Sequence, residues 1–168
     1  IRSKTSNVTT AKAYNVEWQS RYALNENDYV FGRIAVDDDE FSAYDRQMRE
    51  VVGYGRRLRE TERHLWNAQV GVGARQADLR NGMSQDDSIV YLGTDYRFAI
   101  SETSTFSQTL SVEHGSDNRY TEAKSSLSAE IRNNLAVVLS YTIKNNSDVL
   151  PGTDKTDTFT SISIEYGF

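Results

Sequence analysis

Residues 158–168 read TFTSISIEYGF, and the alternation within them is the clearest indication of the fold. Counting back from the terminus in twos gives one face of mostly apolar and aromatic side chains: Phe168, Tyr166, Ile164, Ile162 and Thr160. The residues between them are small or polar: Gly167, Glu165, Ser163 and Ser161. Because successive side chains of a strand point to opposite faces, this stretch predicts a β-strand that is apolar on one side and polar on the other.

The same alternation recurs along the chain. Polar breaks separate about nine segments, at residues 12–24, 29–37, 48–58, 64–76, 89–100, 104–114, 120–131, 135–144 and 158–168. In the fourth segment, Trp66, Val70 and Val72 alternate with Asn67 and Gln69. Short segments of period two with polar breaks are typical of all-β proteins, so we expect one antiparallel up-and-down sheet.

The breaks between these segments alternate in length. Tight breaks at 25–28, 59–62, 101–103 and 132–134 take turns with mostly longer, more acidic ones at 38–45, 80–87, 115–118 and 145–156. Bacterial transmembrane β-barrels have short turns at one rim and longer loops at the other, and about 9–11 residues of each strand cross the membrane. The pattern therefore favours a transmembrane barrel with its apolar face toward lipid.

Composition excludes several other classes. The 168 residues are 38% hydrophobic, with one Pro, no Cys and a net charge of -5. No apolar run approaches the ~18 residues of a spanning helix. The mean hydropathy of -0.63 would suit a soluble protein, but half of each barrel strand can be polar without touching lipid. The negative charge argues against nucleic acid as a partner, and the lack of Cys excludes disulfides.

Several stretches carry a resemblance to a known family. They include residues 29–33 (Tyr-Val-Phe-Gly-Arg), 53–56 (Gly-Tyr-Gly-Arg), 61–63 (Thr-Glu-Arg), 71–73 (Gly-Val-Gly) and 166–168 (Tyr-Gly-Phe). In this order they resemble the YdiY-like family of salt-induced outer-membrane proteins, a domain family of unknown function. The C-terminal Phe also resembles the signal that the barrel-insertion machinery reads in outer-membrane barrels. The resemblance implies the outer membrane of a Gram-negative bacterium, with membrane lipid and lipopolysaccharide as partners.

The strand count bears on the domain boundaries. Bacterial single-chain barrels normally have an even number of strands, so about nine is awkward. We expect residues 1–168 to form a single barrel domain that lacks one or more N-terminal strands, or that holds an unrecognised strand in residues 1–10. Since family members usually carry further strands ahead of this region, the resemblance implies a whole barrel of about 10 to 12 strands.

The polar faces of the segments share charges of both signs. The lumen-lining candidates are Glu17, Arg21, Arg33, Arg75, Asp95, Arg97, Glu113, Glu122, Lys124 and Glu130. One interpretation is a polar lumen that conducts small solutes. The other is a plugged lumen in which acids and bases pair across strands, because an unpaired charge there would be costly. Small barrels are commonly filled by their own side chains, which favours the plug for 8 to 10 strands.

The apolar faces supply candidates for contact with lipid. Those for the lipid-facing surface or an aromatic girdle at the membrane interface are Trp18, Trp66, Val70, Phe98, Ile162, Ile164, Tyr166 and Phe168. Trp and Tyr are enriched where their rings can lie at the level of the lipid headgroups. We therefore expect these positions on the outside of the barrel.

No set of residues indicates catalysis. His114 lies near Ser111, Ser116 and Asp117, so a membrane-embedded hydrolase of lipid or lipopolysaccharide is one alternative. No Gly-x-Ser-x-Gly turn accompanies these residues, however. The acidic run at residues 37–40 could hold a divalent cation, but it lacks the ligand spacing of an EF-hand loop and is expected to be solvated.

We therefore predict a non-enzymatic outer-membrane β-barrel with no catalytic residues, cofactor or metal. It would be a narrow passive channel, or a structural barrel linked to the salt or osmotic response that the family name implies. A soluble lipocalin-like barrel, with the apolar face lining a ligand cavity, is the other alternative.

Overall fold

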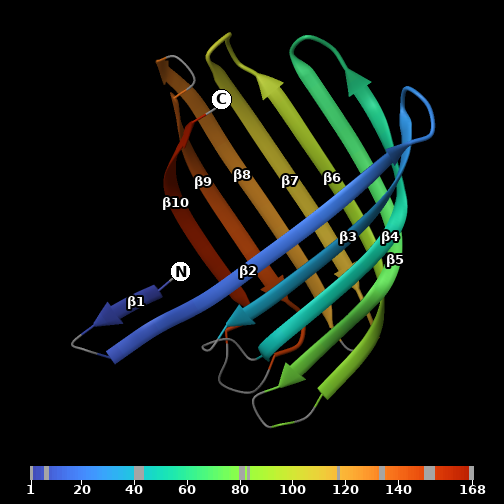
Figure 1. Cartoon of the computed structure of the whole chain (residues 1–168), viewed down its shortest axis with the longest axis vertical. Coiled ribbons are helices and arrows are strands. Elements are labelled where there is room, and N and C mark those ends of the chain that lie inside the picture. The colour runs from blue at the N-terminus through green and yellow to red at the C-terminus, as the bar shows by residue number, and fades with distance from the viewer. Residues whose placement is uncertain are drawn as a thin grey trace.

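The structure is a computed structural model that describes residues 2–5, 8–39, 44–79, 82, 84–116, 118–132, 135–149 and 154–166. Ten strands form one sheet in chain order, each antiparallel to the next (Figure 1). They are β1 (Arg2–Thr5), β2 (Val8–Ala23), β3 (Asp28–Asp39), β4 (Tyr44–Glu60), β5 (His64–Leu79), β6 (Ser84–Ala99), β7 (Ser104–His114), β8 (Arg119–Arg132), β9 (Leu135–Asn146) and β10 (Thr156–Tyr166). The described residues include no helix that is long and apolar enough to span a membrane.

The predicted all-β, antiparallel up-and-down fold is confirmed. The nine expected segments correspond to β2–β10, and β1 lies within residues 1–10, where an unrecognised strand was one of the two explanations for the odd strand count. β1 pairs with β2 from Arg2 opposite Lys12 to Thr5 opposite Val8. The N-terminal residues show no apolar alternation, so only backbone pairing reveals this strand.

The strands at one rim are longer than the sequence predicts. β3 and β4 are separated only by residues 40–43, and β5 and β6 only by residues 80–83, so these two breaks are shorter than expected. β4 has 17 residues, more than the roughly 9–11 that cross a bilayer. Its extra length continues a ladder of polar pairs such as Asp37 with Gln47. Polar hairpins can extend past an apolar band because their backbone groups still pair.

Strand register assigns each side chain to one of two faces. Directly opposed residues share a face, as in the row Gln69, Gly93, Ser111 and Glu122 across β5–β8. On this face side chains of distant strands meet: Arg21 of β2 lies 3.7 Å from Asp95 of β6. Four strand spacings would be about 19 Å in a flat sheet. The sheet is therefore strongly curved, and the polar face is its concave side.

The convex face carries the apolar set. Its exposed side chains include Trp18, Val52, Trp66, Val70, Val72, Leu92, Leu110, Leu127, Leu139, Ile162 and Ile164. At about 3.3 Å per residue and a tilt near 40°, the β5 segment from Trp66 to Ala74 rises about 20 Å, close to the ~25 Å apolar band of outer-membrane barrels. The lipocalin-like alternative is wrong on this point, because it requires the apolar set on the inside.

A small apolar core lies on the concave face, among β3–β6. Phe31, Val51, Ile89 and Tyr91 form this cluster, and Tyr29 packs against it. Inward-facing glycines make room for the rings. The ring of Tyr29 lies over Gly55, that of Phe31 over Gly53 and that of Tyr91 over Gly93, where a Cβ atom would collide with each ring.

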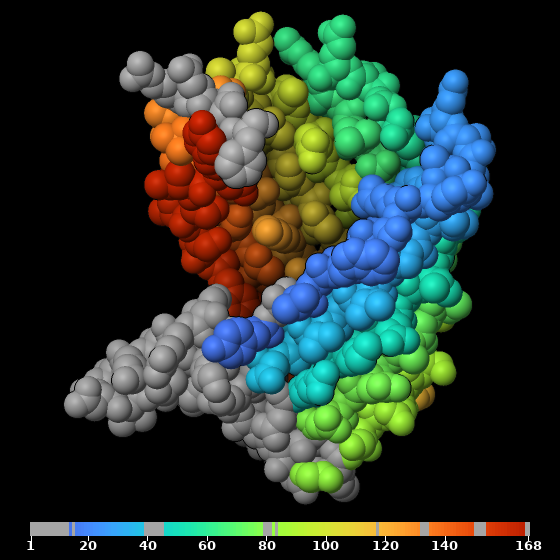
Figure 2. Space-filling view, in the orientation of Figure 1, coloured from blue at the N-terminus to red at the C-terminus, as the bar shows by residue number. Residues whose placement is uncertain are grey.

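The curved sheet is open between its two ends. Among the described residues, the sheet order gives β10 no partner other than β9 and gives β2 none other than β1 and β3. β10 is exposed at every residue. Figure 2 shows β2 in blue and β10 in red on either side of a hollow, with the strands between them in the chain forming its back wall.

Candidate functional site

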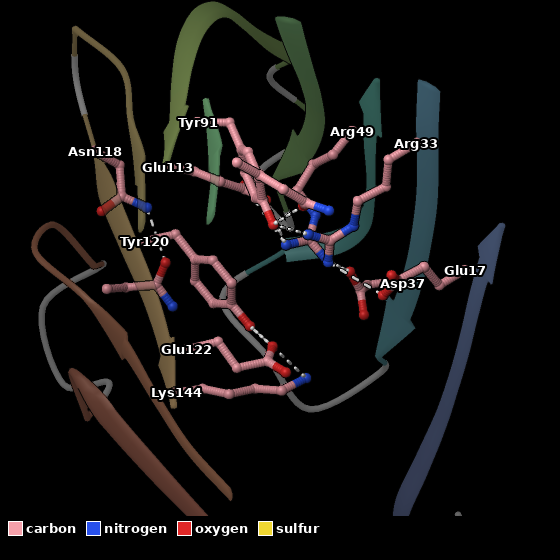
Figure 3. A network of polar contacts seen from close by, with 12 residues as sticks. Glu17, Arg33, Asp37, Arg49, Tyr91, Glu113, Asn118, Tyr120, Glu122 and Lys144 are labelled. Carbon is pink, nitrogen blue, oxygen red and sulfur yellow. Dashed lines mark hydrogen bonds and ion pairs between the residues drawn. The ribbon is translucent and has the colours of Figure 1, made fainter. Parts of the chain in front are cut away.

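Side chains from both walls of the concave face meet near the rim where β3 ends and β4 begins. Arg49 of β4 is 4% exposed and is the centre of this group. Its Nη1 atom donates to both carboxylate oxygens of Glu113 on β7, at 3.3 and 3.5 Å. Its Nη2 atom donates to Asp37 of β3. One buried guanidinium thus joins β3 and β4 to β7, three places further along the sheet (Figure 3).

A second arginine extends the contacts to β2 and β6. Arg33 donates to Glu17 Oε2 at 3.1 Å and to the hydroxyl oxygen of Tyr91 at 3.2 Å. The Tyr91 hydroxyl in turn donates to Gln69 at 3.4 Å. The Arg33 guanidinium also lies 5.4 Å from the centre of the Tyr91 ring. This arginine therefore fixes the ring against the inner wall.

The opposite wall contributes Tyr120, Glu122 and Lys144. The guanidinium of Arg49 lies 5.0 Å from the centre of the Tyr120 ring, and the Tyr120 hydroxyl donates to Glu122 at 2.6 Å. Lys144 lies 3.9 Å from the same carboxylate. We call Glu17, Arg33, Asp37, Arg49, Tyr91, Glu113, Tyr120, Glu122 and Lys144 the cross-lumen network.

Arg75 and Asp87 form a separate buried ion pair at 3.1 Å. The side chain of each is 3% exposed. Asp87 also accepts hydrogen bonds from the backbone N–H and hydroxyl of Ser116, at 3.1 and 2.8 Å. Arg75 lies directly opposite Arg49 in the register of β4 and β5. Two arginines can be buried side by side here because Asp37, Glu113 and Asp87 surround them with negative charge.

Toward the other rim the concave face holds a polar cavity of about 440 Å³. It is lined by side chains of β2, β3 and β5–β8, chiefly amides, hydroxyls and charged groups. Seven of the ten lumen-lining candidates border it: Glu17, Arg21, Arg33, Asp95, Arg97, Glu122 and Lys124. The concave face is therefore packed with charge near one rim and hollow near the other.

The other three lumen candidates lie elsewhere on this face. Glu113 and Arg75 are buried in ion pairs. Glu130 is exposed near the tight turn between β8 and β9.

Most of the lipid-facing candidates are exposed on the convex face. They are Trp18, Trp66, Val70, Ile162, Ile164 and Tyr166. Phe98 is half-buried, and its ring stacks 4.9 Å from that of His64. Phe168 lies outside the described residues. Polar groups within this surface are hydrogen-bonded to one another: His64 to Tyr96 at 2.8 Å and Trp66 to Thr94 at 2.8 Å.

Sequence reasoning did not select Arg49, Tyr120 or Asp87, although each has a central place. Arg49 lies an even number of residues from the inward glycines of β4, and Tyr120 lies two residues from Glu122. The alternation along each strand therefore already places both side chains on the inward face. Asp87 falls in a stretch expected to be a loop, whereas β6 begins at Ser84.

The hydrolase candidates are not assembled. Ser111 is buried on the concave face, whereas His114 is exposed and has the opposite parity on the same strand. The hydroxyl of Ser116 donates to Asp87, and Asp117 lies outside the described residues.

The described part of the acidic run at residues 37–40 is not assembled as a cation site either. Asp37 binds Arg49, and Glu40 lies outside the described residues. Within the described part of the chain, no group of three His, Cys, Asp or Glu side chains could hold a metal ion.

Comparison with known proteins identifies the family. The model of the family described as "Protein of unknown function, DUF481" matches residues 1–168. The chain belongs to the DUF481 family. Over 158 residues this DUF481 protein is 23% identical to the uncharacterized protein YdiY of Escherichia coli (strain K12), a match covering 94% of the chain and 62% of that relative. The predicted YdiY-like membership is thus confirmed, and the chain spans less than two thirds of the relative's length.

A solved structure shares the fold. The chain is similar to a NanC porin in a rhombohedral crystal form, with a TM-score of 0.64 and 12% sequence identity. The match covers 93% of this chain and 79% of the porin chain. The fold is therefore that of a porin-like β-barrel.

Proposed function

We propose that this protein is a non-enzymatic outer-membrane β-barrel of a Gram-negative bacterium that acts as a narrow passive channel for small polar solutes. One observation carries the proposal: an apolar convex face encloses a polar concave face that contains a cavity. Lipid requires the first property, and passage of hydrated solutes requires the second. The porin-like fold supports the same assignment.

The sheet edges set a condition for this proposal. Unpaired backbone N–H and C=O groups cannot face hydrocarbon, so β10 and the β1–β2 edge must be covered in a membrane. We propose that further strands of the same polypeptide pair with them, extending the ten strands of the structure to a barrel of about 12. Mass spectrometry of the mature protein and cross-linking between introduced cysteines would test this. A mature polypeptide limited to residues 1–168, with β10 cross-linked to β2, would contradict it.

Placement in the outer membrane also implies partners for the protein. The exposed apolar face is proposed to contact outer-membrane lipid and lipopolysaccharide, and the C-terminal strand to be read by the barrel-insertion machinery. Deletion of Phe168 is then expected to slow assembly into the membrane.

Conductance across planar bilayers tests the function. A small, steady conductance is expected from the wild-type protein, with the cross-lumen network as its narrowest level. Tyr91→Ala removes a ring that lies in the lumen and is expected to raise the conductance. Tyr54→Ala removes an exposed ring of the convex face and serves as the matched control. A silent bilayer, or equal effects of the two variants, would overturn the channel.

A structural barrel without transport is the second candidate. The observation that favours it is the buried network, which joins β4 to β7 through Arg49 and Glu113. In that case both Tyr variants would be silent in the bilayer, while unfolding would still depend on the network.

A further inference from the structure

The polar cavity has an uneven balance of charge. Each acid that lines it has a cation at hand: Glu17 lies 3.1 Å from Arg33, and Asp95 lies 3.7 Å from Arg21. Glu122 lies 3.9 Å from Lys144, on the neighbouring strand. The acids of the cavity are therefore already neutralised by other side chains.

Two cations of the cavity wall are not used to neutralise these acids. Arg97 of β6 and Lys124 of β8 line the cavity. Both are exposed to it, and neither forms an ion pair or hydrogen bond with any described residue. Glu130, on the same strand as Lys124, lies six residues further on, about 20 Å along the strand, and does not line the cavity.

Register brings these two cations to the same stretch of wall. Arg97 lies opposite Ser107 on β7, and Lys124 lies opposite Thr109 on β7 from the other side. Only β7 separates their strands. Lys124 shares its row with Asp95, and Arg97 lies in the next inward row, so the Cα atoms of the two cations are about 12 Å apart. The hydroxyls of Ser107 and Thr109 lie between them and also line the cavity.

We propose that this stretch binds a small oxyanion, a carboxylate or a phosphate, between Arg97 and Lys124. A guanidinium presents paired N–H donors that match two oxygens of one anion, and an ammonium adds a compact charge. The hydroxyls of Ser107 and Thr109 supply further donors. The cavity is large enough for such an anion with part of its water.

The inference deepens the proposed function, because in a conducting barrel the same site gives a preference for anions. That preference opposes the charge of the whole chain, which is -5 and would by itself attract cations. An anion preference would therefore arise locally, from Arg97 and Lys124.

Two measurements on the complete polypeptide in detergent and in bilayers test the site. Calorimetric titration with inorganic phosphate is expected to show binding to the wild type, weakened at least tenfold in the double variant R97Q/K124Q. Because both side chains are exposed, the double variant is expected to keep its fold, which circular dichroism would check. The matched control is R46Q, which removes one positive charge at an outward-facing position of β4. No binding by the wild type, or equal loss in R46Q, would overturn the site.

Reversal potentials in a potassium chloride gradient separate this inference from the channel proposal. A chloride preference that R97Q/K124Q abolishes supports both. Phosphate binding without conductance supports the anion site and overturns the channel. Conductance without phosphate binding or chloride preference overturns the anion site and leaves the channel.

Discussion

Arg49 and Glu113 form a buried ion pair, but mutation of one partner has a different consequence from mutation of the other. Glu113 is 1% exposed, and among the described residues Arg49 is the cation that its carboxylate contacts. Arg49 binds a second carboxylate, that of Asp37. Removing the arginine therefore isolates a buried charge, whereas removing Glu113 does not.

This asymmetry sets the expected free energies. Arg49→Met leaves Glu113 without a cation and should lower the free energy of unfolding by about 3–5 kcal/mol. Glu113→Leu leaves Arg49 paired with Asp37 and should cost about 2 kcal/mol. The double variant R49M/E113L no longer contains the buried Glu113 charge that R49M isolates, and should be no less stable than R49M. The sum of the two single costs should therefore exceed the double cost by at least about 2 kcal/mol.

Urea unfolding of the protein in lipid vesicles, followed by far-ultraviolet circular dichroism, measures these differences. Arg57→Met is the matched control: it removes one half of a pair whose side chains are 38% and 58% exposed, and should cost at most about 1 kcal/mol. Costs that simply add, or an E113L cost larger than that of R49M, would refute the reasoning.

Two further predictions concern the walls of the barrel. Val70→Arg places a charge on the exposed apolar face and should cost about 2–4 kcal/mol if that position faces mid-bilayer lipid; Val70→Leu is the control, and equal unfolding curves would contradict the lipid-facing assignment. Gly71→Ala places a Cβ atom 2.8 Å from the carbonyl oxygen of Val52 and should cost about 1–3 kcal/mol. Gly32→Ala, with nothing within 4 Å of the new atom, should leave stability unchanged; an equal loss at both glycines would contradict the close packing of β4 against β5.

Alternation predicted the sheet well because each strand carries its own signal. Trp66, Val70 and Val72 indicate an outward face without reference to any other segment. β1 carries no such pattern, since its residues are polar on both faces and its place depends on pairing with β2. The breaks at 38–45 and 80–87 were predicted too long for a related reason: pairs such as Asp37 with Gln47 look like loop residues yet continue the ladder.

The partners within the lumen could not be predicted in the same way. That Arg49 meets Glu113 depends on how tightly the sheet curls, because β5 and β6 lie between their strands. Curvature is a property of the whole sheet, and it cannot be predicted from the sequence of one strand. Inward parity alone would have identified Arg49 and Tyr120 as lumen residues, but not their partners.

The rings laid over inward glycines suggest how the bore of such a barrel can change during evolution. Beneath Tyr29, Phe31 and Tyr91 the wall is bare backbone, at Gly55, Gly53 and Gly93. Exchange of one ring for a smaller side chain would widen the passage at that level without altering strand number, register or the surface that meets lipid. In the proposed channel, single substitutions at these three positions would change the size of solute that relatives with the same sheet admit.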